Sequence, residues 1–176
     1  MSDVFENKGT MAATIVVAAS DSLNKGAANY VCDGTDDHVE IQAALDALPD
    51  TGGEVFLLDG TYNIEASLVL GSYQTLRGCG RNTILTTTTA GIDIITATGS
   101  VGSEKVGILV ADLCIDGTAG GASTGEAILF DYVDYSKITG NWFLNNASDD
   151  IKISNCDFNE FTNNHHEGSA DGIFAS

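Results

Sequence analysis

Apolar residues near the start of the chain follow first a strand-like and then a helix-like pattern. Residues 14–18 are apolar or β-branched, which predicts a strand. Four apolar residues then recur at the spacing of one helical face, namely Ile41, Ala44, Leu45 and Leu48. We therefore expect an amphipathic helix over residues 36–48 that begins at Thr35 or Asp36 as N-cap and ends at Pro49.

From residue 53 onward the helical pattern stops and short apolar runs take over. Gly, Asn, Asp and Ser separate these runs, as expected for strands joined by tight turns. The runs are residues 55–58, 68–70, 83–85, 92–95, 106–110, 127–130, 151–153 and 173–174. This part of the chain is predicted to be all β.

The second half of the chain repeats itself every 22 or 23 residues. Six pairs of similar residues share this spacing: Ile128 with Ile151, Ile151 with Ile173, Val133 with Cys156, Tyr135 with Phe158, Ile138 with Phe161, and Asn141 with Asn164. A period of this length with several short strands and no helix is typical of a parallel β-helix, in which each coil stacks on the last.

The repeat and the helical segment divide the chain into three regions. Residues 1–11 are expected to form a mobile leader, residues 12–52 an N-terminal cap of one strand and one helix, and residues 53–176 about five coils of a parallel β-helix. Upstream coils are longer, which we interpret as loop insertions. No polar cap follows the last coil, so the natural protein is expected to continue or another subunit to cover that end.

The segment around the predicted helix resembles a known family. Its motifs are Asp33-Gly34-Thr35-Asp36-Asp37, Ile41-Gln42-Ala43-Ala44-Leu45, Gly52-Gly53-Glu54-Val55-Phe56-Leu57, Asp59-Gly60-Thr61-Tyr62 and Thr75-Leu76-Arg77-Gly78-Cys79-Gly80. Together they resemble the first part of the pectate lyase-like right-handed β-helix superfamily. The resemblance implies a right-handed single-stranded parallel β-helix whose helix caps the first coil. Members include polysaccharide lyases, glycoside hydrolases, uronate epimerases, phage tailspikes and non-catalytic surface proteins, so the resemblance indicates the fold more strongly than the function.

Three acidic residues of the repeat form a candidate calcium site. Glu126, Asp149 and Asp171 each stand two residues before an inward Ile, so stacking should bring their carboxylates within about 10 Å of one another. Such a group must bind a cation or protonate, and calcium prefers oxygen ligands. The alternative is that these are hydrated turn acids of an acidic protein.

Few residues offer acid–base chemistry in this region. His165, His166 and Lys152 are candidates for a general base, the lysine only if its pKa were lowered. Candidate substrate-binding residues are Arg77, Arg81 and Asp150. The alternative for the histidines is structural, because the repeat places Trp142 over His165 and Phe143 over His166. Signature runs of the enzymatic members, such as Asp-Pro-His-Glu of the uronate epimerases, are absent, so the sequence leaves catalysis undecided.

Composition restricts the partners. Seven Lys and Arg stand against 25 Asp and Glu, and the net charge of −18 argues against nucleic acid and against a polyanion unless a cation bridges the two. No apolar run is long enough for membrane insertion, and no signal peptide pattern is present. The four cysteines form no metal-binding pair and are expected to be small buried residues: Cys32, Cys79, Cys114 and Cys156.

Two functions fit these observations. The first is an extracellular, cell-surface or virion module that binds glycan and has, in its finer form, a calcium-assisted lyase-like activity on uronate polymers. The second is a non-catalytic rod in a spike, fibre or surface assembly. Alternation places large apolar groups at Leu129 and Phe174 outside the coil, with Lys152 between them, which favours a homo-oligomer or an end-to-end assembly.

Overall fold

The described strands stack into parallel sheets. The computed structural model describes residues 13–117, 125–168 and 172–175. The first sheet contains, in spatial order, β2 (Tyr30–Val31), β1 (Thr14–Ala18), β3 (Gly53–Leu57), β6 (Gln74–Arg77), β10 (Leu109–Ala111), β14 (Lys137–Thr139) and β17 (Glu160–Thr162). The second contains β4 (Gly60–Asn63), β7 (Thr83–Thr86), β11 (Cys114–Asp116), β15 (Trp142–Leu144) and β18 (His165–Glu167). The third contains β5 (Leu68–Val69), β8 (Ile95–Thr98), β12 (Ile128–Asp131), β16 (Ile151–Ser154) and β19 (Ile173–Ala175).

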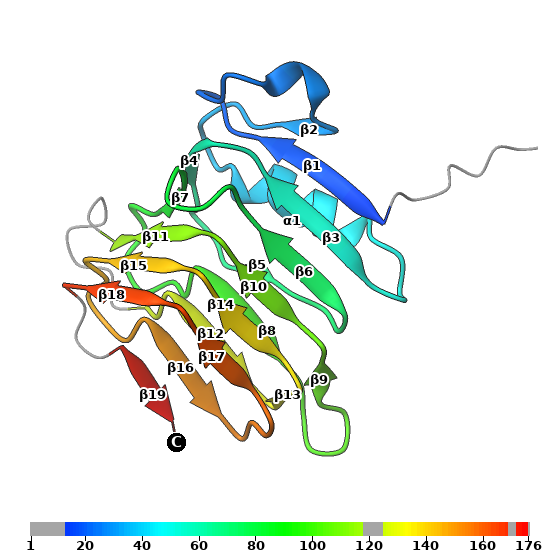
Figure 1. Cartoon of the computed structure of the whole chain (residues 1–176), viewed down its shortest axis with the longest axis vertical. Coiled ribbons are helices and arrows are strands. Elements are labelled where there is room, and N and C mark those ends of the chain that lie inside the picture. The colour runs from blue at the N-terminus through cyan, green and yellow to red at the C-terminus, as the bar shows by residue number, and fades with distance from the viewer. Residues whose placement is uncertain (1–12, 118–124, 169–171, 176) are drawn as a thin grey trace, which may run out of the picture.

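The chain visits the three sheets in turn, so each coil lies directly under the preceding one (Figure 1). A short pair, β9 (Lys105–Val106) with β13 (Val133–Asp134), adds a further ladder at the corner before the first sheet. The predicted spacing is confirmed in the register: Ile128 pairs with Ile151, which pairs with Ile173, and Ile138 pairs with Phe161. The sequence therefore predicted a parallel β-helix correctly.

Inward residues build a continuous apolar core along the solenoid. Leu68, Ile95, Ile128 and Ile151 are all fully buried and succeed one another in the third sheet. Because like residues stack, the buried side chains of one coil pack on those of the next. Outward positions of the same sheet alternate as predicted, since Leu129 is half-buried and Phe174 is exposed.

Helix α1 (His38–Asp46) packs against β1, β2, β3 and β5, and Figure 1 shows it behind the first strands. It buries Ile41, Ala44 and Leu45, as the periodicity predicted. It is two residues shorter at each end than expected. At its N-terminal end the reason is Asp36, whose φ of +53° no helical residue adopts. The N-cap is Asp37, whose carboxylate bonds the N–H groups of Gly34 and Asn63 instead of the helix.

A short 3₁₀ helix, η1 (Lys25–Ala27), lies between β1 and β2. No helix within the described residues is both long and apolar enough to cross a membrane. All four cysteines are free thiols, and Cys32 and Cys114 are buried as expected. Cys79 is exposed, which corrects the expectation for that residue: it lies on the turn that follows β6.

Candidate functional site

Three acidic side chains occupy equivalent positions above and below one another, each two residues before a strand of the third sheet. They are Asp93, Glu126 and Asp149. Asp93 Oδ1 accepts the N–H of Glu126 at 2.8 Å, and Glu126 Oε2 accepts the N–H of Asp149 at 2.9 Å. Each of the two upper carboxylates thus satisfies a backbone donor of the next coil. Sequence reasoning brought Glu126 and Asp149 together but missed Asp93, because a longer coil separates it by 33 residues. Asp171 lies outside the described residues.

Lys152 holds Glu126 from the next strand. The ammonium Nζ lies 3.0 Å from Glu126 Oε1, and Glu126 is only 8% exposed. Burial opposes ionisation of Glu126, but hydrogen bonds from Ser148 and Lys152 outweigh it and lower the pKa of this carboxyl. The hydrogen bond to Glu126 in turn raises the pKa of Lys152. A general base must be neutral to accept a proton, so this pairing works against Lys152 in that role.

A calcium site in the acidic column would need the oxygens of Glu126. Glu126 accepts a backbone N–H on one oxygen and contacts an ammonium group with the other. A calcium ion would have to displace Lys152 to reach this carboxylate, because ammonium and metal compete for the same lone pairs. At Glu126 the observed geometry fits a structural ladder of carboxylates, in which Lys152 occupies the place that a calcium ion would need.

His166 faces the interior of the solenoid. It continues an inward column of the second sheet and stacks on fully buried Phe143, with ring centroids 5.2 Å apart and planes 11° from parallel. Its Nδ1 lies 2.7 Å from Oδ2 of Asp150, which is completely buried. Asn146 Nδ2 donates to the other oxygen of Asp150 at 2.8 Å. His166 and Asp150, predicted as base and substrate ligand, therefore contact each other on the inner side of the coil, where Asp150 is buried and the His166 side chain is 29% exposed.

His165 points to the opposite side of the same strand. It pairs in register with half-buried Trp142, and its Nε2 lies 3.6 Å from Oε2 of Glu167. More than half of its side chain is exposed. The two neighbouring histidines thus lie on opposite faces of β18 and do not form one site.

The two predicted arginines lie apart from the histidines. Arg77, at the end of β6, contacts Oε2 of Glu54 at 3.2 Å and covers the ring of Phe56, 5.1 Å from the centroid. Arg81 is exposed on the turn that leads into β7. Arg77 is therefore on the outer face of the first sheet, where a ligand lying across the strands would meet it.

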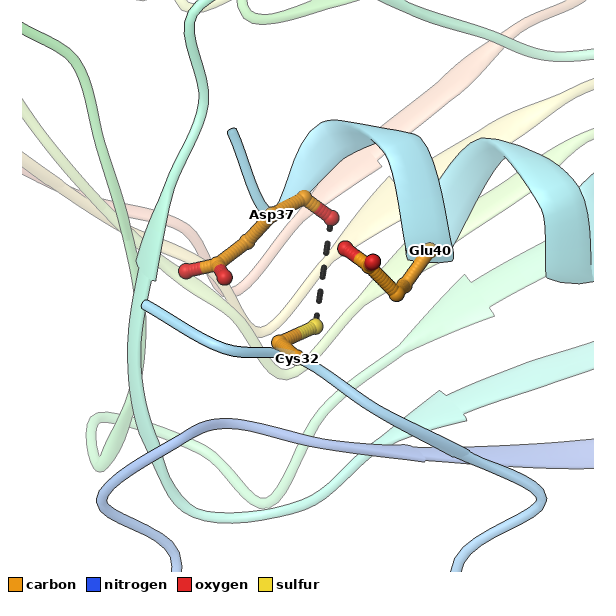
Figure 2. A group of neighbouring side chains, drawn as sticks. All are labelled: Cys32, Asp37 and Glu40. Atoms are coloured by element: carbon orange, nitrogen blue, oxygen red, sulfur yellow. Dashed lines mark hydrogen bonds between the residues drawn. The ribbon is translucent and has the colours of Figure 1, made fainter. Parts of the chain in front are cut away.

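A second cluster, not predicted from the sequence as a site, joins Cys32 to Asp37, the N-cap of α1, and to Glu40 in its first turn. The Cys32 thiol and single carboxylate oxygens of Asp37 and Glu40 lie within 4.8 Å of one another. Figure 2 shows the Asp37 carboxylate turned away from Glu40, toward the side where it accepts the N–H groups of Gly34 and Asn63. Burial, and then the charge of Asp37, raise the pKa of Cys32 to about 12, and its S–H contacts the Asp37 carbonyl at 3.9 Å. A protonated thiol and an engaged carboxylate fit a structural brace for the start of the helix.

Asn141 and Asn164, which share the repeat spacing, form a ladder of stacked amides. Asn141 is fully buried, and its Oδ1 accepts the N–H of Leu113 at 3.1 Å. Asn164, one coil further on, accepts the N–H of Asn141 at 3.1 Å with its own Oδ1. At this corner the amide oxygens accept backbone N–H groups of a neighbouring coil, as the carboxylates of Asp93 and Glu126 do at theirs.

The outer face of the first sheet carries polar side chains in register. One outward row contains Glu54, Thr75, Leu109, Lys137 and Glu160, and the next contains Phe56, Arg77, Ala111, Thr139 and Thr162. Lys137 Nζ and Glu160 Oε1 are 3.0 Å apart, and the hydroxyls of Thr139 and Thr162 are 3.0 Å apart. Sequence reasoning missed this face, because only the register shows which polar residues become neighbours.

Comparison with solved structures identifies the fold. A protein of Geobacillus virus E2, the ORF18 product, is 21% identical, superposes with a TM-score of 0.64, and matches 81% of this chain and 28% of its own. The A-module of an Azotobacter vinelandii mannuronan C-5 epimerase is 20% identical with a TM-score of 0.58, over 79% of this chain and 50% of that one. The chain therefore shares the parallel β-helix fold with these proteins.

A third β-helix relative comes from Parabacteroides merdae. This protein, proposed to be a glycosyl hydrolase, is 16% identical with a TM-score of 0.53 and is matched over 78% of this chain and 83% of its own. No protein-family model and no curated protein sequence matches the chain. The present β-helix spans about a quarter of the viral protein and half of the epimerase module.

Proposed function

We propose that this β-helix is a module that binds carbohydrate along the outer face of its first sheet. The fold is shared with an epimerase module that acts on mannuronan and with a protein proposed to be a glycosyl hydrolase. That likeness supports the fold alone, so the proposal rests on the surface of this chain.

The observation that carries the proposal is the in-register arrangement of outward polar side chains on β6, β14 and β17, with Leu109 and Ala111 of β10 between them. Parallel strands about 4.8 Å apart repeat the same outward positions along the solenoid. Thr139 and Thr162 present hydroxyl groups in one row, and Lys137 with Glu160 presents donors and acceptors in the neighbouring row. A rigid surface with repeated hydroxyl, ammonium and carboxylate groups suits a polymer of repeated hydroxylated units.

The charges on this face favour an uncharged glycan. Its two cations, Arg77 and Lys137, are each paired with a glutamate, so this face carries no excess of positive charge in a chain whose net charge is −18. A uronate polymer would be repelled unless a divalent cation bridged it to the protein. We expect no binding to nucleic acid and no membrane insertion for the same electrostatic and compositional reasons.

A finer form of the proposal is a calcium-assisted lyase-like activity. It would use Glu126, Asp149 and Asp171 as ligands and His165 or His166 as the base that abstracts a proton. The contacts of Glu126 with Lys152 and of His166 with Asp150 weigh against it. Calorimetric titration with calcium tests it, and Asp149→Asn combined with Asp171→Asn is the control that must remove any heat.

The second candidate function is a non-catalytic rod in an extracellular, cell-surface or virion assembly. Exposed apolar side chains on the third sheet favour it, since Val69 is 55% exposed and Phe174 is 42% exposed. A homo-oligomer or end-to-end stack would cover them. A mass of one subunit by light scattering, for both the native chain and Phe174→Lys, would contradict this function.

Affinity measurements with soluble glycans test the binding proposal. Uncharged and uronate oligosaccharides are titrated into the full chain, with calcium and with chelator. Replacing Thr139 and Thr162 by Ala should weaken binding, whereas replacing outward Thr96 and Ser154 of the third sheet should not. Absence of binding to every glycan, with the fold intact by circular dichroism, would refute carbohydrate binding.

A further inference from the structure

Three aromatic side chains stand exposed along one corner of the solenoid, just before the first sheet. Tyr73 is 55% exposed, Tyr135 is 64% exposed and Phe158 is 74% exposed. Other aromatic residues, such as Tyr62, Phe130 and Phe143, are fully buried. The three exposed rings, together called the aromatic ladder below, are therefore not needed to fill the core.

Backbone hydrogen bonds align the ladder. The N–H of Tyr73 donates to the carbonyl of Val106, which precedes Gly107. In the same way, the N–H of Gly107 donates to the carbonyl just before Tyr135, and the N–H of Tyr135 donates to the carbonyl just before Phe158. This is the pattern of a parallel register, so Tyr73, Gly107, Tyr135 and Phe158 occupy one position in successive coils. Two of the rings stack, since the centroids of Tyr135 and Phe158 are 4.8 Å apart and their planes differ by 9°.

The backbone at this position is strained for aromatic residues. All four residues of the column have positive φ, with values of 63° at Tyr73, 67° at Gly107, 49° at Tyr135 and 56° at Phe158. This left-handed region is uncommon for bulky side chains and is adopted freely by glycine. Gly107 shows that the coil accepts glycine here. Exposed aromatic rings at strained positions are a poor choice for stability alone, and such residues gather at functional sites.

A groove lies near the ladder and is lined by Gln74, the residue that follows Tyr73 in the chain. It has a volume of about 470 Å³ and lies between the end of α1 and the corner of the solenoid, where it is lined by Asp46, Gln74 and Lys105 among others. A smaller pocket of about 250 Å³ shares these three residues and reaches Ser72, the neighbour of Tyr73. The smaller pocket is lined by negative charges at Asp46 and Asp50 and by a positive charge at Lys105. The hydroxyl of Ser72 and the amide of Gln74 add hydrogen-bonding groups.

We propose that the aromatic ladder and this groove form a binding site for the sugar rings of an uncharged glycan. The C–H groups of a pyranose ring pack on an aromatic face, whose negative quadrupole attracts them. Its hydroxyl groups donate to carboxylates, and Asp134 and Asp157 directly precede Tyr135 and Phe158. The same carboxylates repel a uronate. This inference rests on the proposed carbohydrate binding and names the ligand class and the residues that stack on it.

Glycine variants test the ladder without disturbing the fold. Tyr135→Gly and Phe158→Gly remove the rings and suit the positive φ, so these variants are expected to fold. Phe174→Ala is the matched control, an exposed aromatic on the third sheet. Uncharged gluco-, manno- and xylo-oligosaccharides are titrated calorimetrically into each full-length variant. The double glycine variant should bind at least tenfold more weakly than the native chain, and Phe174→Ala should bind as the native chain does.

The possible failures are distinguishable. Native affinity in the double glycine variant would overturn the ladder and leave carbohydrate binding by the first sheet intact. Binding only to uronates would overturn the choice of an uncharged ligand, again without refuting carbohydrate binding. Conversion of an oligomer into a monomer by the glycine variants would identify the ladder as a contact between copies and would also overturn it.

Discussion

Asp150 is completely buried, and its Oδ2 lies 2.7 Å from Nδ1 of His166. Asn146 donates to the other carboxylate oxygen at 2.8 Å. A buried carboxylate with no donors would be costly, so the contacts with His166 and Asn146 help to stabilise an acid inside the coil. The pair therefore links strand β18 to the corner that precedes β16.

Removing this carboxylate should destabilise the fold. Asp150→Ala leaves Asn146 and His166 without their shared acceptor, and we expect the free energy of unfolding to fall by about 1–3 kcal/mol. Urea unfolding measures the change. Asp50→Ala, on an exposed turn, is the control and should have little effect. Equal stability of the two variants would show that the Asp150 network contributes nothing.

Glu126 should make stability depend on pH. Its pKa is lower in the folded than in the unfolded chain, so this carboxylate stabilises the fold fully above the ordinary glutamate pKa of about 4.3. The contribution is lost as the pH falls through the folded pKa. Glu126→Gln should therefore lower the free energy of unfolding by about 1 kcal/mol at pH 7 and by less below about pH 4. The loss is small because solvent screens the partly exposed Lys152.

The control for Glu126 is Glu160→Gln, which breaks the exposed pair with Lys137. Its effect at pH 7 should be close to zero because solvent screens the pair. Chemical denaturation at several pH values measures both variants. A Glu126→Gln effect that stays constant from pH 7 to pH 3 would contradict the assigned pKa direction.

Asn141 should matter more than its repeat partner Asn164. Asn141→Ala removes the acceptor for the N–H of Leu113 and the donor to the carbonyl of Val110, both in buried surroundings. We expect a loss of about 2–3 kcal/mol in unfolding free energy. Asn164→Ala, at the same position in a more exposed coil, should lose less, and a larger loss there would argue against this account.

Two glycines offer a test of how tightly the coils pack. A Cβ at Gly125 would lie 1.8 Å from the carbonyl oxygen of Ile92, a backbone atom that cannot move aside, whereas a Cβ at Gly26 would meet nothing within 4 Å. Gly125→Ala should lower stability by about 3 kcal/mol or more, and Gly26→Ala should be neutral or slightly stabilising. Thermal unfolding of both variants measures the difference.

The cysteines should differ in reactivity. Burial is the main cause that raises the pKa of Cys32 to about 12 and of Cys114 to about 11, so both remain protonated and unreactive near neutral pH. Exposed Cys79 should therefore give the fast phase with an aromatic disulfide reagent. Cys79→Ser should abolish that phase, and a fast phase that survives this substitution would contradict the assignment.

The sequence predicted the architecture because inward residues repeat wherever coils have equal length. The pairing of Ile138 with Phe161 and of Ile128 with Ile151 follows from one spacing. Where coils differ in length the signal fails, and Asp93 was missed for that reason. Of the aromatic ladder, the sequence spacing showed only the pair Tyr135 and Phe158. Gly107 interrupts the row of aromatic residues, and longer coils separate Tyr73 from that pair.

The roles of the candidate site residues could not be predicted from their spacing in the sequence, because they depend on hydrogen bonds and contacts in the folded chain. Glu126 and Asp149 were correctly placed together, but hydrogen bonds to backbone N–H groups of the next coil and the contact with Lys152 arise from the shape of the corner. His165 and His166 are neighbours in the sequence and face opposite sides of one strand. Alternation predicts this, but it does not predict the buried partner Asp150.

The unequal coil lengths have an evolutionary consequence. Val110 pairs with Leu76 on one side and with Ile138 on the other, across 34 and 28 residues, yet both ladders keep the same register. Length added at a corner is absorbed there and does not propagate into the sheets. Selection can therefore lengthen, shorten or rewrite individual corners independently, so this scaffold can acquire new recognition surfaces while its core remains unchanged.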